Sequence, residues 1–266
     1  MILERDGVAL HVVEEGNGQP VVLLHGHSLD LRVWDDVAPS LAGEGFQVIR
    51  YDQRGHGRSS SPPAGYRWGD HAADLLGVIA AAGVRPAHVV GLSKGGGIAL
   101  EATVRDSGAV RSLALVGPLV PDFPLSAELV ASFRDVARAI REGGVQGALG
   151  RWLGHPLLAS AHAMPGARER LEAMVRAFPA GEYFAQRDEP DREWLVTSRL
   201  GEIVAPTLIV SGARDVPDFA AMAALLSEHV SGAALEIVEE CGHLVPLERP
   251  GQLAAMLVDH LRAAGD

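Results

Sequence analysis

The chain has 266 residues, 47% of them hydrophobic, so it can bury one large core or two modest ones. Its formal net charge of −11 at pH 7 argues against a general nucleic-acid binder, which needs a basic face. The single cysteine, Cys241, excludes an internal disulfide and fits a reducing compartment.

Apolar runs along the chain predict the strands. Residues 8–14 alternate between apolar and polar side chains, whereas residues 20–24 are continuously apolar, as in a strand covered on both faces. The further strands are expected at residues 46–51, 88–92, 111–116, 206–211 and 234–238. Helical spacing predicts helices at residues 34–42, 70–82, 95–105, 218–229 and 251–264. This alternation indicates a mostly parallel sheet with helices on both faces.

One long interval, residues 121–199, breaks the alternation. It contains no convincing strand, is rich in helical patterns, and is too long for a simple crossover. We expect a helical insertion over the functional edge of the sheet, with helices packed to one side as the alternative. Most of its aromatic residues should form its core, and one or two should face a pocket. They are Phe133, Trp152, Phe178, Tyr183, Phe184 and Trp194.

Reactive side chains follow several of the predicted strands. They are Ser93, Asp215 and His243, together with the turn His25-Gly26-His27. In open parallel sheets the carboxyl ends of the strands meet at one edge, where ligands bind. A serine becomes a nucleophile when histidine takes its proton, and a carboxylate fixes the imidazole. The pattern therefore predicts nucleophilic catalysis at this edge.

Ser93 lies between a predicted strand and a predicted helix, in the sequence Gly91-Leu92-Ser93-Lys94-Gly95. The flanking glycines suit a sharp turn in which neighbouring backbone passes without β-carbons. The alternative is that Ser93 only caps the following helix.

A series of short motifs resembles the α/β-hydrolase superfamily. The serine turn is similar to its nucleophile elbow, Leu24-His25-Gly26 to its oxyanion loop, and residues 51–59 to the loop after its fourth strand. Residues 211–215 resemble its acid-bearing turn, and Cys241-Gly242-His243 its histidine loop. The resemblance implies an α/β-hydrolase fold, with a mostly parallel eight-stranded sheet flanked by helices. Residues 1–120 and 200–266 would form the core, and residues 121–199 a helical lid inserted before the strand leading to the catalytic acid.

The resemblance also implies a role for each motif residue. Ser93 would be the nucleophile, His243 the general base and Asp215 the acid, although Asp218 is a rival for the acid if it does not cap the next helix. The oxyanion hole would consist of the backbone N–H groups of His27 and Lys94. Candidate substrate-binding residues are Lys94, His27, Trp152 and Tyr183.

The lysine after the nucleophile is unusual, because this position often carries an apolar or aromatic side chain in the superfamily. Its charge also opposes the helix dipole at the start of the helix. Two interpretations stay open. The ammonium of Lys94 faces the pocket and meets a substrate anion, or it reaches solvent or pairs with a lid acid such as Glu182 or Asp188.

A metal centre is not expected. His25 and His27 with Asp30 resemble part of a metal-binding run, but the remaining ligands of such a set are missing. We expect no cofactor.

The resemblance favours small bacterial serine hydrolases similar to enol-lactonases, carboxylesterases and haloperoxidases. The expected reaction is cleavage of a small ester or lactone through an acyl-enzyme. Substrates that carry a carboxylate are included in this expectation. The alternatives are a hydrolase of a carbon–carbon bond in a diketone and a non-catalytic binder on the same fold. The serine at the elbow disfavours dehalogenases and epoxide hydrolases, which carry aspartate there.

We expect a cytoplasmic protein whose partner is a small molecule rather than nucleic acid or a membrane. Glu4 and Asp6 lie where a signal peptide would have an apolar core. The most apolar candidate span, residues 72–84, is interrupted by Asp74 and Gly77. The sequence does not indicate an oligomeric state.

Overall fold

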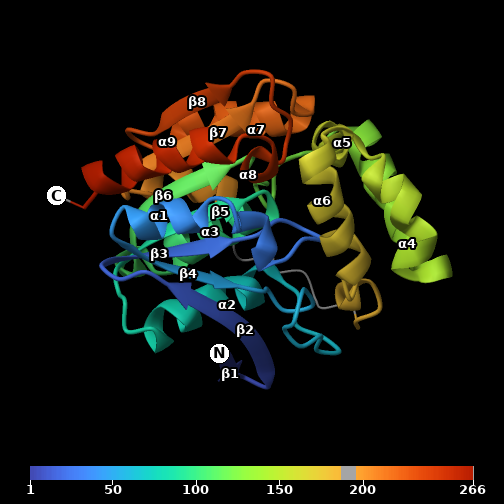
Figure 1. Cartoon of the computed structure of the whole chain (residues 1–266), viewed down its shortest axis with the longest axis horizontal. Coiled ribbons are helices and arrows are strands. Elements are labelled where there is room, and N and C mark those ends of the chain that lie inside the picture. Colours follow the sequence, from blue (N-terminus) through green and yellow to red (C-terminus); the bar gives the residue numbers. More distant parts are fainter. Residues whose placement is uncertain (187–195, 266) are drawn as a thin grey trace.

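A computed structural model describes residues 1–186 and 196–265. Its strands form one eight-stranded sheet in the order β1-β2-β4-β3-β5-β6-β7-β8 (Figure 1). From β4 to β8 every pair is parallel, whereas β2 is antiparallel to both β1 and β4. The strands are β1 (Ile2–Arg5), β2 (Val8–Glu15), β3 (Gln19–Leu24), β4 (Phe46–Tyr51), β5 (Ala87–Leu92), β6 (Val110–Val116), β7 (Thr207–Gly212) and β8 (Ala234–Val238).

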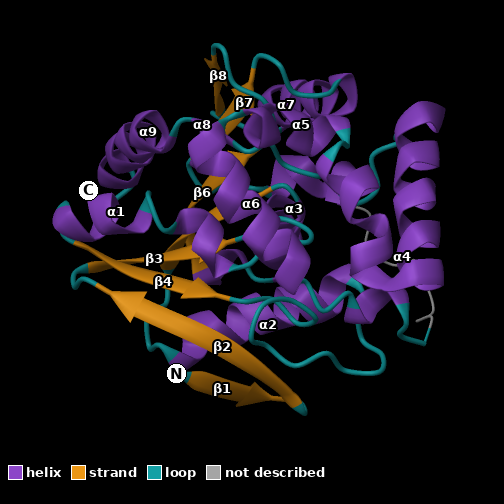
Figure 2. Cartoon of the chain, turned by 45° about the vertical axis from the view of Figure 1, so that its right-hand side comes forward, coloured by secondary structure: helices purple, strands orange, loops and turns teal. Residues whose placement is uncertain are grey.

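Helices cover both faces of this sheet (Figure 2). On one face α1 (Ala38–Gly43) packs against α9 (Pro250–Ala263), and on the other α2 (Trp68–Ala81) packs against α3 (Lys94–Arg105). Helix α7 (Pro217–His229) contacts β7 and β8, and the short α8 (Val245–Glu248) precedes α9. Every residue of β5 and β7 is buried, which explains why these strands are mostly apolar.

Between β6 and β7 the chain leaves the sheet and forms the helical insertion expected from the sequence. Its helices are α4 (Ala127–Leu153), α5 (Pro156–Ala163) and α6 (Pro165–Ala177), followed by the 3₁₀ turn η3 (Gly181–Tyr183). Figures 1 and 2 show these helices grouped beyond the strand ends, with α4 outermost. Helix α4 is broken at Gly144, whose φ of 65° is not helical. We call this insertion the lid.

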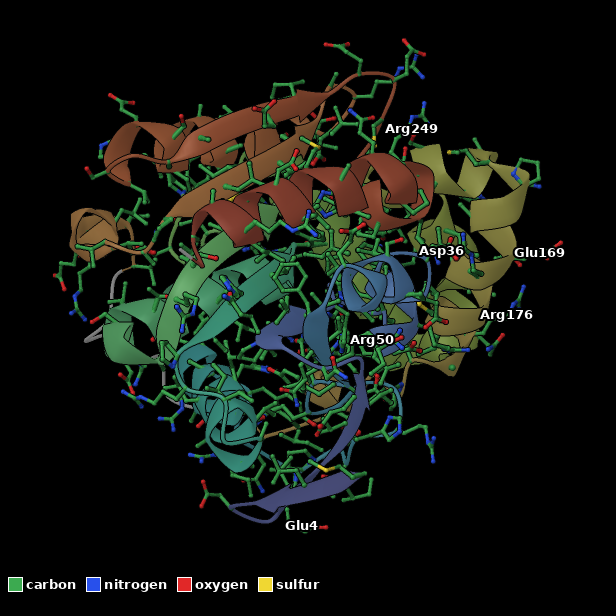
Figure 3. The ribbon with its side chains drawn as sticks, turned by 60° about the vertical axis from the view of Figure 1, so that its left-hand side comes forward. Glu4, Asp36, Arg50, Glu169, Arg176 and Arg249 are labelled. Carbon is green, nitrogen blue, oxygen red and sulfur yellow. The ribbon has the colours of Figure 1, made fainter. Side chains whose placement is uncertain are left out.

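Polar contacts hold the two ends of the lid together and attach its beginning to the core. Where the lid begins, the backbone N–H and hydroxyl of Ser126 donate to Asp218 in the first turn of α7. Where it ends, Thr197 donates to the carboxylate of Asp122, which follows β6. Arg170 of α6 forms an ion pair with Asp36 of the core, which lies beside the lid in Figure 3.

The structure confirms the eight-stranded sheet and differs from the sequence analysis at two elements. The sequence analysis did not list β1, although Asp6-Gly7, both with positive φ, is the signal of a two-residue hairpin turn. The helix expected at residues 34–42 is two elements, the 3₁₀ helix η1 (Leu31–Trp34) and α1. Pro39 in the first turn of α1 explains where the second element starts. Among the described residues, no helix is both long and apolar enough to span a membrane.

Gly212 lets the loop after β7 touch the loop after β8. A β-carbon on Gly212 would lie 2.0 Å from the backbone oxygen of Gly242, so the loops would have to separate. We expect Gly212→Ala to lower the free energy of unfolding by about 1–3 kcal/mol, measured by urea denaturation. Gly43→Ala is the control, because a β-carbon there meets nothing within 4 Å. Equal stability of both variants would contradict this account.

Candidate active site

The backbone at Ser93 turns sharply between β5 and α3. Its φ of 53° and ψ of −116° are strained for any residue with a β-carbon. The turn can be this tight only because residues 91 and 95 are glycines. A β-carbon on Gly91 would lie 2.4 Å from the Gly95 oxygen, and one on Gly95 would lie 2.7 Å from the Leu24 oxygen. Ser93 occupies the N-cap position of α3, but its side chain makes no capping hydrogen bond. Helix capping therefore does not account for the serine.

His243 is held by Asp215. The imidazole Nδ1 donates to Asp215 Oδ2 over 2.8 Å, with both side chains almost fully buried. The second oxygen, Oδ1, accepts from the backbone N–H of Val216 at 2.7 Å. Phe219 packs edge-on against the imidazole, with ring centroids 4.4 Å apart. Because Nδ1 carries the proton, Nε2 is left as the acceptor that a general base needs.

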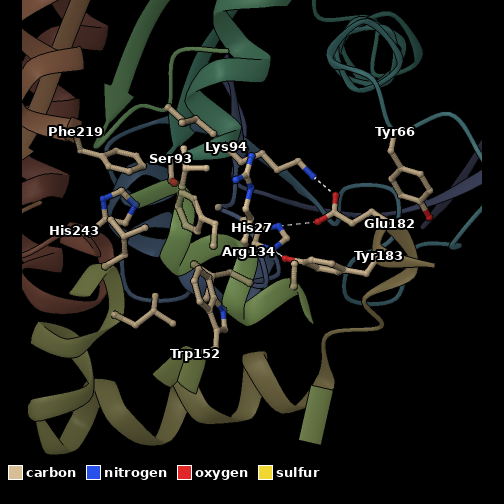
Figure 4. Close-up of a pocket in the computed structure, with 18 of the residues that line it drawn as sticks. His27, Tyr66, Ser93, Lys94, Arg134, Trp152, Glu182, Tyr183, Phe219 and His243 are labelled. Atoms are coloured by element: carbon tan, nitrogen blue, oxygen red, sulfur yellow. Dashed lines mark hydrogen bonds and ion pairs between the residues drawn. The ribbon is translucent and has the colours of Figure 1, made fainter. Parts of the chain in front are cut away.

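Ser93 and His243 line the same cavity and lie side by side in Figure 4. No hydrogen bond joins Ser93 to another side chain among the described residues, and bonds between a nucleophile and its base often tighten only when substrate is bound. The structure thus brings together the three residues expected from the sequence. Asp218 is not part of this group, and its contact is with Ser126 rather than a cap of its own helix α7, whose N-cap is Val216.

His25 braces the loop after β3. Its Nδ1–H donates to Gly26 O at 2.8 Å, and its Nε2 accepts from the backbone N–H of Gln53 at 2.9 Å. Burial lowers the pKa of His25, so the neutral form that this pattern requires is favoured. Gly26 lies close to the nucleophile, because a β-carbon there would be 3.3 Å from Ser93 Cβ. The next residue, His27, is thereby placed at the cavity wall.

One lid carboxylate, Glu182, contacts both candidate oxyanion residues. Glu182 Oε2 accepts from Lys94 Nζ at 2.8 Å, and Oε1 accepts from His27 Nδ1 at 2.9 Å (Figure 4). Burial raises the pKa of Glu182, but Lys94 and His27 outweigh it and hold the pKa well below its usual range. Of the two interpretations of Lys94, the structure places its ammonium on a lid acid. The other acid considered, Asp188, lies outside the described residues.

The cavity beside Ser93 has a volume of about 670 Å³ and is lined mainly by apolar side chains. Trp152 and Tyr183, both expected at the substrate, line it. Trp152 Nε1 donates to Ser28 Oγ at 2.5 Å, and Tyr183 OH lies 2.7 Å from His27 Nε2. Phe133 also lines the cavity, so more of the lid aromatics face it than expected. Trp194 lies outside the described residues.

Arg134 is a cavity residue that the sequence analysis missed. Figure 4 shows its side chain pointing from α4 into the pocket, and no ion pair of it is found among the described residues. One face of α4 lines the cavity, at positions 130, 133, 134, 137 and 141. This helical spacing was present in the sequence and could have revealed the arginine.

The nearest arrangement to a metal site is His27, His56 and Glu182, whose ligand atoms lie within 4.8 Å of one another. The ammonium of Lys94 contacts the same carboxylate, and its charge opposes a second cation there. Of the set named from the sequence, His25 and His27 with Asp30, His25 bonds Gly26 and Gln53, and Asp30 binds Arg32. His155 of the lid is buried, and its Nε2 lies 2.9 Å from Ser132 Oγ.

Comparisons with known proteins find similar chains. The family described as the alpha/beta hydrolase fold matches residues 19–250. The 2-hydroxymuconate semialdehyde hydrolase of Pseudomonas sp. (strain CF600) is 28% identical, covering 97% of this chain and 92% of that protein. The solved N-acyl homoserine lactone degrading enzyme Est816 has a TM-score of 0.79 at 29% identity, covering 97% and 98% of the two chains. The malate-bound esterase of Thermogutta terrifontis has a TM-score of 0.82 at 26% identity, covering 99% and 97%.

The contact between His243 and Asp215 predicts how fast Ser93 reacts with a fluorophosphonate. We expect Asp215→Asn to slow labelling of Ser93 by about 10³-fold or more, because the amide cannot hold the required tautomer. Asp218→Asn should label at nearly the native rate, since Asp218 contacts only Ser126 among the described residues. Mass spectrometry of the labelled peptide measures both rates. Equal slowing in the two variants would argue against Asp215 as the acid.

Proposed function

This chain belongs to the alpha/beta hydrolase fold family, and we propose that it is a serine hydrolase that cleaves a small carboxylic ester or lactone. The observation that carries the proposal is the buried His243–Asp215 pair beside Ser93 in one cavity. Residues at the ends of β3 and β5 complete that cavity wall, in the arrangement that acyl transfer requires.

In the proposed reaction His243 Nε2 takes the proton of Ser93 as Oγ attacks the substrate carbonyl. The carbonyl π bond opens, and the resulting oxyanion accepts hydrogen bonds from the backbone N–H groups of His27 and Lys94. His243 then returns the proton to the leaving alcohol, and the acyl group stays on Ser93. Water, activated by the same imidazole, hydrolyses the acyl-enzyme and regenerates the serine.

The cavity supports a small, largely apolar substrate. Its volume of about 670 Å³ lies within the range of small-molecule sites. Aromatic and aliphatic side chains form most of the wall, including Phe133, Trp152 and Leu158, so an apolar acyl or alcohol group packs there. Two of the relatives reported above support the ester or lactone class, one being a lactone-degrading enzyme and the other an esterase.

We propose that the substrate carries a carboxylate and that Arg134 binds it. Lys94 is already paired with Glu182, whereas Arg134, a solvent-exposed residue of the cavity lining, has no ion-pair partner among the described residues. A guanidinium matches a carboxylate in shape and charge. That the related Thermogutta terrifontis esterase is solved with malate, a dicarboxylate, supports this class.

Carbon–carbon bond hydrolysis is the second candidate, because a relative over 97% of this chain is a 2-hydroxymuconate semialdehyde hydrolase. The same nucleophile and base would serve, with a carbanion rather than an alkoxide as the leaving group. The two candidates differ in which substrate is turned over.

A substrate panel tests the function. We expect the protein to hydrolyse p-nitrophenyl acetate and short lactones, and Ser93→Ala to lower turnover to the background rate, measured by absorbance and pH-stat titration. A vinylogous diketone offered alongside should be cleaved far more slowly than the esters. If the diketone is the better substrate, the second candidate replaces the first. Native turnover by Ser93→Ala would contradict both.

Matched neutral and carboxylated esters test Arg134. We expect Arg134→Gln to lower kcat/KM by about tenfold on the carboxylated ester only, because one charge-assisted contact is lost. Arg138→Gln is the control, since Arg138 lies on the same helix but pairs with Asp135. Lys94→Met should affect both esters equally. An equal effect of Arg134→Gln on both esters would contradict carboxylate binding.

A further inference from the structure

We propose that Glu182 is a positioning residue that sets the geometry of the oxyanion hole from the lid. This inference rests on the proposed function, because it needs the backbone N–H groups of His27 and Lys94 as the two donors. The observation behind it is that a single carboxylate binds the side chains of both residues.

The two donors lie on separate parts of the chain. His27 follows β3 in a loop, whereas Lys94 opens helix α3 after the sharp turn at Ser93. An oxyanion needs both N–H groups at hydrogen-bond distance from one point, and small misplacement is costly in rate. Glu182 spans them, with 2.9 Å to His27 Nδ1 and 2.8 Å to Lys94 Nζ.

Tyr183 completes the hold on His27. The low pKa of Glu182 keeps its carboxylate an acceptor, so His27 Nδ1 is the donor in their contact. In the neutral imidazole Nε2 then accepts from Tyr183 OH, over 2.7 Å. Burial raises the pKa of Tyr183, so the hydroxyl keeps the proton that it donates. Both ring nitrogens of His27 are therefore engaged by consecutive lid residues.

Glu182 also compensates an unfavourable charge. The ammonium of Lys94 lies in the first turn of α3, where the helix dipole disfavours a cation. Only 11% of the Lys94 side chain and 19% of the Glu182 side chain are exposed, so solvent screens this pair less than a surface pair. Without the carboxylate, the Lys94 ammonium would lose its ion-pair partner at the start of α3.

Glu182 and Tyr183 both belong to η3 of the lid. The oxyanion hole in this account has its full geometry only when the lid lies on the core. Covering of the substrate by the lid and positioning of the oxyanion donors therefore occur together, through the adjacent residues Glu182 and Tyr183.

The first test separates kcat from KM on a neutral ester, so that Arg134 plays no part. We expect Glu182→Ala to lower kcat by about tenfold to a hundredfold with little change in KM. This is less than the loss of about 10²–10³ for removing a donor outright, because the backbone donors remain. Glu182→Gln should be intermediate, since its one oxygen satisfies only one partner. Tyr183→Phe should give a smaller loss of kcat.

The second test measures inhibitor affinity and separates positioning from a merely structural role. A trifluoromethyl ketone adds Ser93 Oγ to its carbonyl and places an oxyanion in the hole, whereas the matching methyl ketone stays planar. Glu182→Ala should weaken the trifluoromethyl ketone in parallel with kcat and leave the methyl ketone unchanged. Arg170→Gln is the control, because it removes another lid–core ion pair, with Asp36, away from the cavity.

The outcomes are distinct. Native kcat and native trifluoromethyl ketone affinity in Glu182→Ala, with turnover still lost in Ser93→Ala, overturn this inference alone. Native turnover in Ser93→Ala overturns the proposed function beneath it. Equal losses in Glu182→Ala and Arg170→Gln would show that only lid attachment matters and would also overturn it. If Glu182→Ala does not fold, as judged by circular dichroism, the same criteria apply to Glu182→Gln and Tyr183→Phe.

Discussion

The site depends on the strained backbone of one residue, Ser93. A positive φ at a residue with a β-carbon is unfavourable, and the surrounding structure must hold it. It does so by close approach of backbone segments at Gly91 and Gly95, where any side chain would collide with main-chain oxygens. The parallel sheet then brings the loops after β7 and β8 to the same edge, so that His243, bonded to Asp215, lines the same cavity as the serine.

The lid supplies a carboxylate that compensates a charge beside Ser93. In the core alone, an ammonium next to the nucleophile would be an uncompensated charge at the wrong end of a helix dipole. Glu182 pairs with Lys94 and, through its other oxygen, holds His27. Arg134 on α4 also lines the cavity and has no ion-pair partner among the described residues. The lid therefore supplies two of the charged groups at the cavity, Glu182, which pairs with Lys94, and Arg134.

Sequence patterns predicted most of the fold, and Ser93 and His243, which the sequence singled out, line one cavity. Strands buried on both faces are mostly apolar, and this pattern can be recognised in the sequence. Where two backbone segments approach too closely for a β-carbon, only glycine fits, and these glycines can be recognised as well. The partner of Lys94 was only one of two interpretations, because the direction of a long flexible side chain depends on a lid segment 88 residues away. Arg134 was missed although its helix face is periodic, since a pattern shows which face is buried and not what it faces.

Hydrogen bonds hold the base of the lid. Asp122 and Thr197 tie its first and last segments together, and Asp218 ties Ser126 to α7. These hydrogen bonds oppose rotation of the whole insertion about its base as a rigid body. The insertion can still bend along its own length while these contacts stay in place. The interruption of α4 at Gly144 is a joint already present there.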